Sequence, residues 1–95
     1  MQKSVLVEIL RSLSRKEMRD IHKWLLSPAH NQRQDVIKLF DYLGKHLSGS
    51  EDGMTKEQAW RALFPAQAYD DAFMRQVMYF LLKAIEEYLV FLQCL

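Results

Sequence analysis

Several residue types that usually shape a fold are scarce in this sequence. It has one cysteine, Cys94, so no disulfide can form within the chain, and nothing in the composition requires an oxidising compartment. There are only three glycines and two prolines, β-branched residues are sparse, and no stretch alternates apolar and polar residues. These absences argue against a β-sheet and favour helices as the regular structure of the chain.

Long uncharged apolar runs are also missing. The apolar stretch near the N-terminus reaches Glu8 after a few residues, which is too short for a signal peptide. The apolar-rich stretch that begins at Val77 is interrupted by Lys83, Glu86 and Glu87, so it falls short of the roughly 18 residues of a membrane span. We therefore predict a cytoplasmic protein without a membrane partner.

An excess of charge of one sign is absent from the chain as a whole, because the formal net charge is +1. The charge is nevertheless uneven: residues 1–46 contain nine Lys and Arg against five Asp and Glu, and residues 47–95 contain four against seven. The simplest interpretation of the basic half is a solvated helix face. Overall charge thus gives no reason to expect nucleic acid as the partner.

Apolar residues recur at helical spacing along the whole chain, and capping signals divide the pattern into segments. Ser14 and Thr55 begin capping boxes, while Asn31 and Asp70 are predicted N-caps and Gly44 is a possible early end of the third helix. The predicted helices run from Gln2 to Leu13, from Arg15 to Leu26, from Gln32 to Leu47, from the Thr55 cap to Pro65, and from Asp71 to Leu95.

The expected fold is therefore all-α, a single five-helix bundle with a long C-terminal helix. Residues 1–95 are expected to form one helical domain. No helix-stop signal precedes Leu95, which favours the interpretation that this domain is the N-terminal part of a longer protein.

The last predicted helix has a wider apolar arc than a surface helix needs. At about 100° per residue its apolar side chains cover roughly 200°, whereas a surface helix needs little more than about 100°. Either this helix is central, with the other four around it, or part of its arc binds a partner. That partner would be a second copy, giving an oligomer, or further helices of a longer parent chain. The candidate interaction residues are Trp24, Met78, Leu82, Leu89, Phe91, Leu92 and Leu95.

The favoured function is therefore a protein–protein interaction or scaffold module that binds helices through its C-terminal helix. The alternative is a DNA-binding regulator with a helix-turn-helix-like helix pair. Its candidate basic patch consists of Arg11, Arg15, Lys16, Arg19 and Lys23. Against this alternative, a recognition helix should begin with Arg, Lys, Asn or Gln, whereas the last predicted helix begins at Asp70 and Asp71.

Residues typical of catalysis or metal binding do not form a recognisable pattern. No nucleophile-elbow or phosphate-loop motif occurs, and His22, His30 and His46 lack the spacing of metal ligands. Helix capping explains the adjacent Asp70 and Asp71. We therefore predict a non-enzymatic protein without a metal or cofactor.

Two resemblances follow from longer strings of residues. The segments Leu10 to Asn31, Met54 to Pro65 and Tyr69 to Leu82 together resemble a helical module of uncharacterised bacterial proteins. In those proteins the module resembles an N-terminal cap before long helical segments, and the resemblance implies no activity. The pattern L-x-x-L-S-x-x-E-M-x-x-I-x-x-x-L (Leu10 to Leu25) is more weakly similar to the first two helices of pyrin and death-effector domains. That resemblance implies a six-helix adaptor that self-associates, which the long fifth helix fits poorly.

Overall fold

The computed structural model describes residues 5–47 and 55–94, and within them it contains helices and no strand. The expected all-α architecture with a long last helix is confirmed. In chain order the helices are α1 (Val5–Ser12), α2 (Arg15–Leu26), α3 (Gln34–Leu47), α4 (Lys56–Leu63) and α5 (Asp71–Gln93). The predicted ends at Gln2 and Leu95 lie outside the described residues.

The predicted caps of three helices are confirmed by hydrogen bonds. The Ser14 hydroxyl accepts from the Glu17 backbone N–H at 3.1 Å, and the Ser14 N–H donates to the Glu17 carboxylate at 2.8 Å. Thr55 and Gln58 form the same reciprocal pair at the start of α4. The Asp70 carboxylate accepts from the third residue of α5. Each cap satisfies backbone donors that the first helical turn leaves free.

The start of α3 differs from its prediction. The helix begins at Gln34 rather than Gln32, because Asn31 does not cap it. The Asn31 side chain instead donates to the Leu25 carbonyl at 3.0 Å and to the Arg33 carbonyl at 3.1 Å, and accepts from the Arg33 N–H. These bonds fix the loop between α2 and α3. The suggested early end at Gly44 was also wrong, since α3 continues to Leu47.

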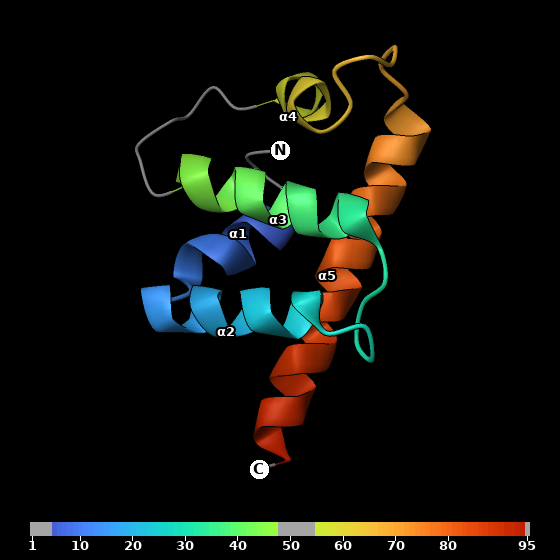
Figure 1. The fold of residues 1–95 in the computed structure, drawn as a ribbon. Coiled ribbons are helices and arrows are strands. Elements are labelled where there is room, and N and C mark those ends of the chain that lie inside the picture. Colours follow the sequence, from blue (N-terminus) through green and yellow to red (C-terminus); the bar gives the residue numbers. More distant parts are fainter. Residues whose placement is uncertain (1–4, 48–54, 95) are drawn as a thin grey trace.

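Helix α5 is one of two central elements of the bundle. Like α3, it packs against each of the other four helices, and its largest interface is with α3. In Figure 1 it crosses behind α2 and α3 and continues past α2 to the C-terminal end. At about 1.5 Å per residue its 23 residues span roughly 34 Å, against roughly 18 Å for the 12 residues of α2.

The core lies along the inner face of α5. Six residues of this helix are buried: Met74, Val77, Leu81, Ala84, Ile85 and Tyr88. Their spacing keeps them on one face, where they meet Leu6 and Leu10 of α1, Ile21 and Leu25 of α2, Val36, Leu39, Phe40 and Leu43 of α3, and Ala59, Trp60 and Leu63 of α4. The central-helix interpretation thus holds for one face of the stretch from Met74 to Tyr88, whereas Arg75, Tyr79 and Lys83 of the same stretch are exposed.

A cluster of polar side chains around Asp71 links the start of α4 to the start of α5. The Asp71 carboxylate forms ion pairs with Lys56 Nζ at 2.9 Å and Arg75 Nε at 2.7 Å, and it accepts a hydrogen bond from the Tyr69 hydroxyl at 2.5 Å. The bond from Tyr69, followed by that from Lys56, lowers the pKa of Asp71. Desolvation, together with this bond, raises the pKa of Tyr69 to about 12.

None of the helices in the described part of the chain combines the length and the apolar character needed to cross a bilayer.

Candidate functional site

The C-terminal turns of α5 carry apolar side chains that the bundle leaves uncovered. Val90 is 59% exposed, Phe91 45% and Leu92 40%, and the preceding Leu89 is half-buried. We call these four residues the α5 end. It projects below α2 in Figure 1, because α5 outruns the helices that pack on it. Single exposed apolar residues are common on protein surfaces, but here three follow one another at a projecting helix end, which makes the α5 end a candidate interaction site.

Trp24, one of the predicted interaction residues, packs within the protein and supports this end. Its ring stacks on His30 with centroids 3.6 Å apart, and it meets the rings of Tyr88 at 5.5 Å and Phe91 at 5.1 Å. The indole N–H is buried and has no hydrogen-bond partner among the described residues. Trp24 therefore fixes the base of the α5 end and leaves Phe91 partly uncovered beside it.

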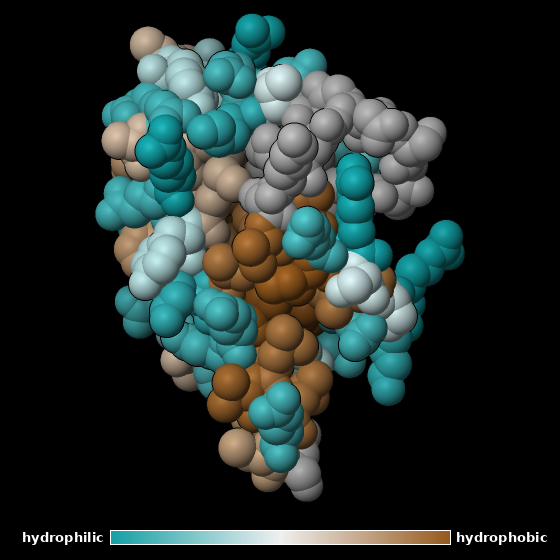
Figure 2. Space-filling view, turned by 180° about the vertical axis from the view of Figure 1, so that it is seen from behind, coloured by the Kyte–Doolittle hydropathy of each residue, from teal (hydrophilic) through white to brown (hydrophobic). Residues whose placement is uncertain are grey.

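Two other predicted interaction residues, Met78 and Leu82, lie on a flank of α5, half-buried and packed against the core. Seen from behind, hydrophobic surface runs from the middle of the molecule down to its lower tip, where α5 ends (Figure 2). Of the predicted interaction residues, Phe91 and Leu92 are thus the exposed ones, and Leu95 lies outside the described residues.

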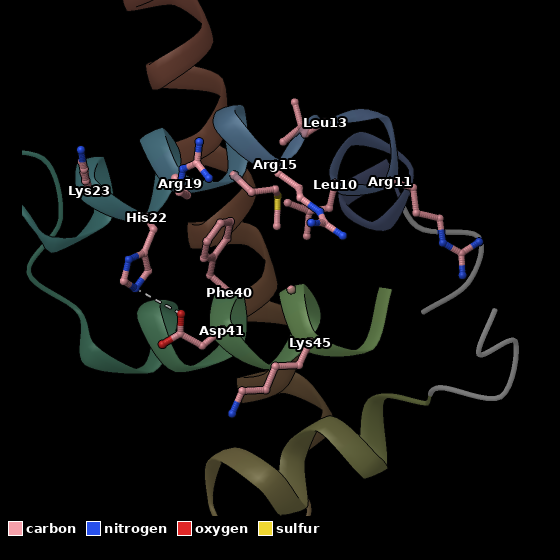
Figure 3. A pocket seen from close by; sticks show the side chains of 12 residues that line it. Leu10, Arg11, Leu13, Arg15, Arg19, His22, Lys23, Phe40, Asp41 and Lys45 are labelled. Atoms are coloured by element: carbon pink, nitrogen blue, oxygen red, sulfur yellow. Dashed lines mark ion pairs between the residues drawn. The ribbon is translucent and has the colours of Figure 1, made fainter. Parts of the chain in front are cut away.

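A second surface is a groove of about 1040 Å³ between α1, α2 and α3. Its floor is apolar: it comprises Leu10 and Phe40, which are 3% and 4% exposed, and Leu13 and Met18, which are half-buried. Figure 3 shows Phe40 between α2 and α3, with α5 passing behind it. We call this feature the basic groove.

The rim of the basic groove contains most of the predicted basic patch. Arg11 comes from the end of α1, and Arg15, Arg19 and Lys23 follow one another at intervals of four residues along α2 (Figure 3). Such spacing puts them on one side of the helix, whereas Lys16 is turned by about 100° and does not line the groove. The structure therefore brings together four of the five predicted residues.

The side of the groove formed by α3 was not predicted from the sequence. Lys45 lies opposite α2, and His22 Nε2 lies 3.2 Å from a carboxylate oxygen of Asp41 across the groove. No spacing rule links residues 11–23 with residues 40–45, because only the packing of α2 on α3 makes them neighbours. Val90 was also missed, although its place between Leu89 and Phe91 was a usable signal.

Among residues 5–47 and 55–94, no three His, Cys, Asp or Glu side chains converge as metal ligands do. Cys94 is exposed beside the α5 end. Comparison of the chain with family models, with curated proteins and with solved structures gives no match.

Proposed function

We propose that this protein is a helix-docking module that self-associates through the α5 end. The observation that carries the proposal is the exposure of Val90, Phe91 and Leu92 on a helix that is otherwise central to the core. Full burial of a large aliphatic or aromatic side chain contributes about 1.5–3 kcal/mol, so covering these residues is favourable. A second copy offers the same projecting helix end, and two such ends can pack against each other around a two-fold axis.

The size of this surface limits the strength of the association. Stable dimers usually bury about 800 Å² on each partner, which is more than four residues of one helix provide. The flank of α5 with Met78 and Leu82 continues the apolar surface and enlarges the contact. We therefore expect weak self-association, with a dissociation constant on the order of 10–100 µM.

The test compares two valines of equal exposure. Val90 and Val5 are both 59% exposed, but Val5 lies at the start of α1, away from the α5 end. Val90→Gln should weaken association about 5- to 30-fold, because a symmetric dimer loses the apolar side chain twice. The Val5→Gln variant should associate like the unmodified chain. Sedimentation equilibrium over a wide range of concentrations measures both.

Folding must remain intact for this comparison. Both valines are exposed, so each substitution should change the free energy of unfolding by no more than about 0.5 kcal/mol. A chain that stays monomeric up to about 1 mM would contradict the proposal. Equal weakening by the two substitutions would also contradict it, because the contact would then not lie at the α5 end.

A further inference from the structure

We infer that the basic groove binds an acidic, amphipathic helix of another protein. This inference does not rest on self-association through the α5 end, since it concerns different residues. It starts from the two chemical layers of the groove: an apolar floor of Leu10, Leu13, Met18 and Phe40 beneath a cationic rim. A partner that fills both layers needs an apolar stripe and negative charges beside it, which is the pattern of an amphipathic helix.

The rim has a strong imbalance of charge. Its described lining residues include five Lys and Arg but one carboxylate, Asp41, and that carboxylate is engaged by His22. Arg11, Arg15, Arg19 and Lys23 are all exposed, and none forms an ion pair with a carboxylate of residues 5–47 or 55–94. Their charges are therefore available to Glu and Asp side chains of a partner, which would supply electrostatic complementarity.

The arrangement of these cations suits a helix in particular. Arg15, Arg19 and Lys23 succeed one another every four residues along α2, so they form a row about 6 Å apart per step. A partner helix lying along α2 presents acidic side chains at the same interval.

The floor of the groove distinguishes a helix from nucleic acid. Single strands bind through bases that stack on exposed aromatic rings. Phe40 is only 4% exposed, and the other ring of the described lining, the His22 imidazole, lies over Phe40 and pairs with Asp41. A duplex contacts cations through its phosphates and has no group that would bury Leu13 and Met18. The apolar stripe of a helix covers both side chains, so the observations favour a protein partner.

The experiment uses the full 95-residue chain and a fluorescent designed helical peptide. The peptide has Leu at i, i+3, i+4 and i+7 positions and Glu beside them, and a second peptide replaces each Glu by Lys. We expect the Glu peptide to bind with a dissociation constant below about 1 mM and the Lys peptide at least about tenfold more weakly in fluorescence anisotropy. A labelled DNA duplex serves as the third probe and should bind more weakly than the Glu peptide.

Two double variants with the same change in net charge locate the site. Arg15→Glu with Arg19→Glu should weaken binding of the Glu peptide at least about tenfold. Lys16→Glu with Lys38→Glu, which changes two exposed lysines outside the groove, should weaken it less than about threefold. Circular dichroism melting curves of both variants should match the unmodified chain, because all four residues are exposed.

Several results would overturn the inference. The Glu peptide could fail to bind, could bind no better than the Lys peptide, or could respond equally to both double variants. Tighter binding of the DNA duplex, lost in the groove variant, would instead assign the groove to nucleic acid. If the groove variant of the chain unfolds, the single change Lys23→Glu replaces it, with Lys38→Glu alone as its control.

Discussion

Gly44 lies in the last turns of α3, opposite Met18 of α2, and lines the basic groove. Its backbone is helical and none of the described residues has a positive φ, so no special conformation requires glycine here. A Cβ atom added at this position would lie 3.6 Å from Met18 Cε, which is an ordinary van der Waals distance. Glycine at this site therefore costs helix stability without a steric reason.

We accordingly expect Gly44→Ala to increase the free energy of unfolding by about 0.5–1 kcal/mol, the usual difference between these residues inside a helix. Urea unfolding followed by circular dichroism measures the change. The substitution should leave the basic groove open, since only one methyl group is added. A loss of stability would mean that the contact with Met18 is tighter than the distance indicates.

The role of Trp24 could not be decided from the residues around it in the sequence. From the sequence this side chain could belong equally to the core or to an interaction surface. Its neighbours are His30 in the following loop and Tyr88 and Phe91 on α5, more than 60 residues away in the chain. Helical spacing around Trp24 contains no information about such distant partners, so its role could not be predicted.

At the scale of elements, local chemistry determined most helix boundaries. The start of α2 after Ser14 and its end before Pro28 were predicted correctly, because a capping box and a proline act on their own few residues. The start of α3 was wrong by two residues. There Asn31 bonds to Leu25 at the end of α2, and this competing, longer-range interaction removes it from the cap.

The cap of α2 also predicts a dependence on pH. The Ser14 N–H lowers the pKa of Glu17 below its ordinary value of 4.5. The charged carboxylate therefore stabilises the folded state above pH 4.5, and this contribution disappears as the pH falls through the lowered pKa. Compared with Glu17→Gln, the unmodified chain should lose stability as the solution is acidified, measured as the urea midpoint at a series of pH values.

Glu57→Gln serves as the matched control, because Glu57 lies in the first turn of α4 but the capping bonds there involve Gln58. Across the same pH range, the stability of Glu57→Gln should follow that of the unmodified chain more closely than the stability of Glu17→Gln does. Parallel profiles for Glu17→Gln and the unmodified chain would show that the Ser14 bond does not depend on the charge of Glu17.

At the scale of the whole molecule, the wide apolar arc of α5 has two explanations in one helix. The other four helices cover one face of its first turns, and they leave its last turns uncovered. The total arc was predictable from periodicity, but the point at which coverage ends depends on how far α2 reaches along α5. That distance follows from the crossing of the two helices, which the sequence does not specify directly.

Substitutions before and after the point on α5 where coverage ends should differ sharply in their effect on the free energy of unfolding. Ile85 is fully buried, so Ile85→Ala should lower the free energy of unfolding by about 2–5 kcal/mol. Leu92 is 40% exposed, and Leu92→Ala should cost less than about 1 kcal/mol. Because α5 packs on all four other helices, unfolding followed by circular dichroism and by tryptophan fluorescence should coincide in both variants.

If Leu92→Ala proved as destabilising as Ile85→Ala, the α5 end would belong to the core and its proposed role in association would fail. If circular dichroism and tryptophan fluorescence gave different unfolding transitions, the bundle would not unfold as one cooperative unit around α5.

The central place of α5 also bears on how the chain is made. Every other described helix packs in part against α5, which the ribosome synthesises after the other four. Until residues 74–88 have emerged from the exit tunnel, the apolar faces of the other helices are not covered by α5. Complete tertiary packing must then wait until α5 has emerged, and the shorter nascent chain is the species that chaperones would meet.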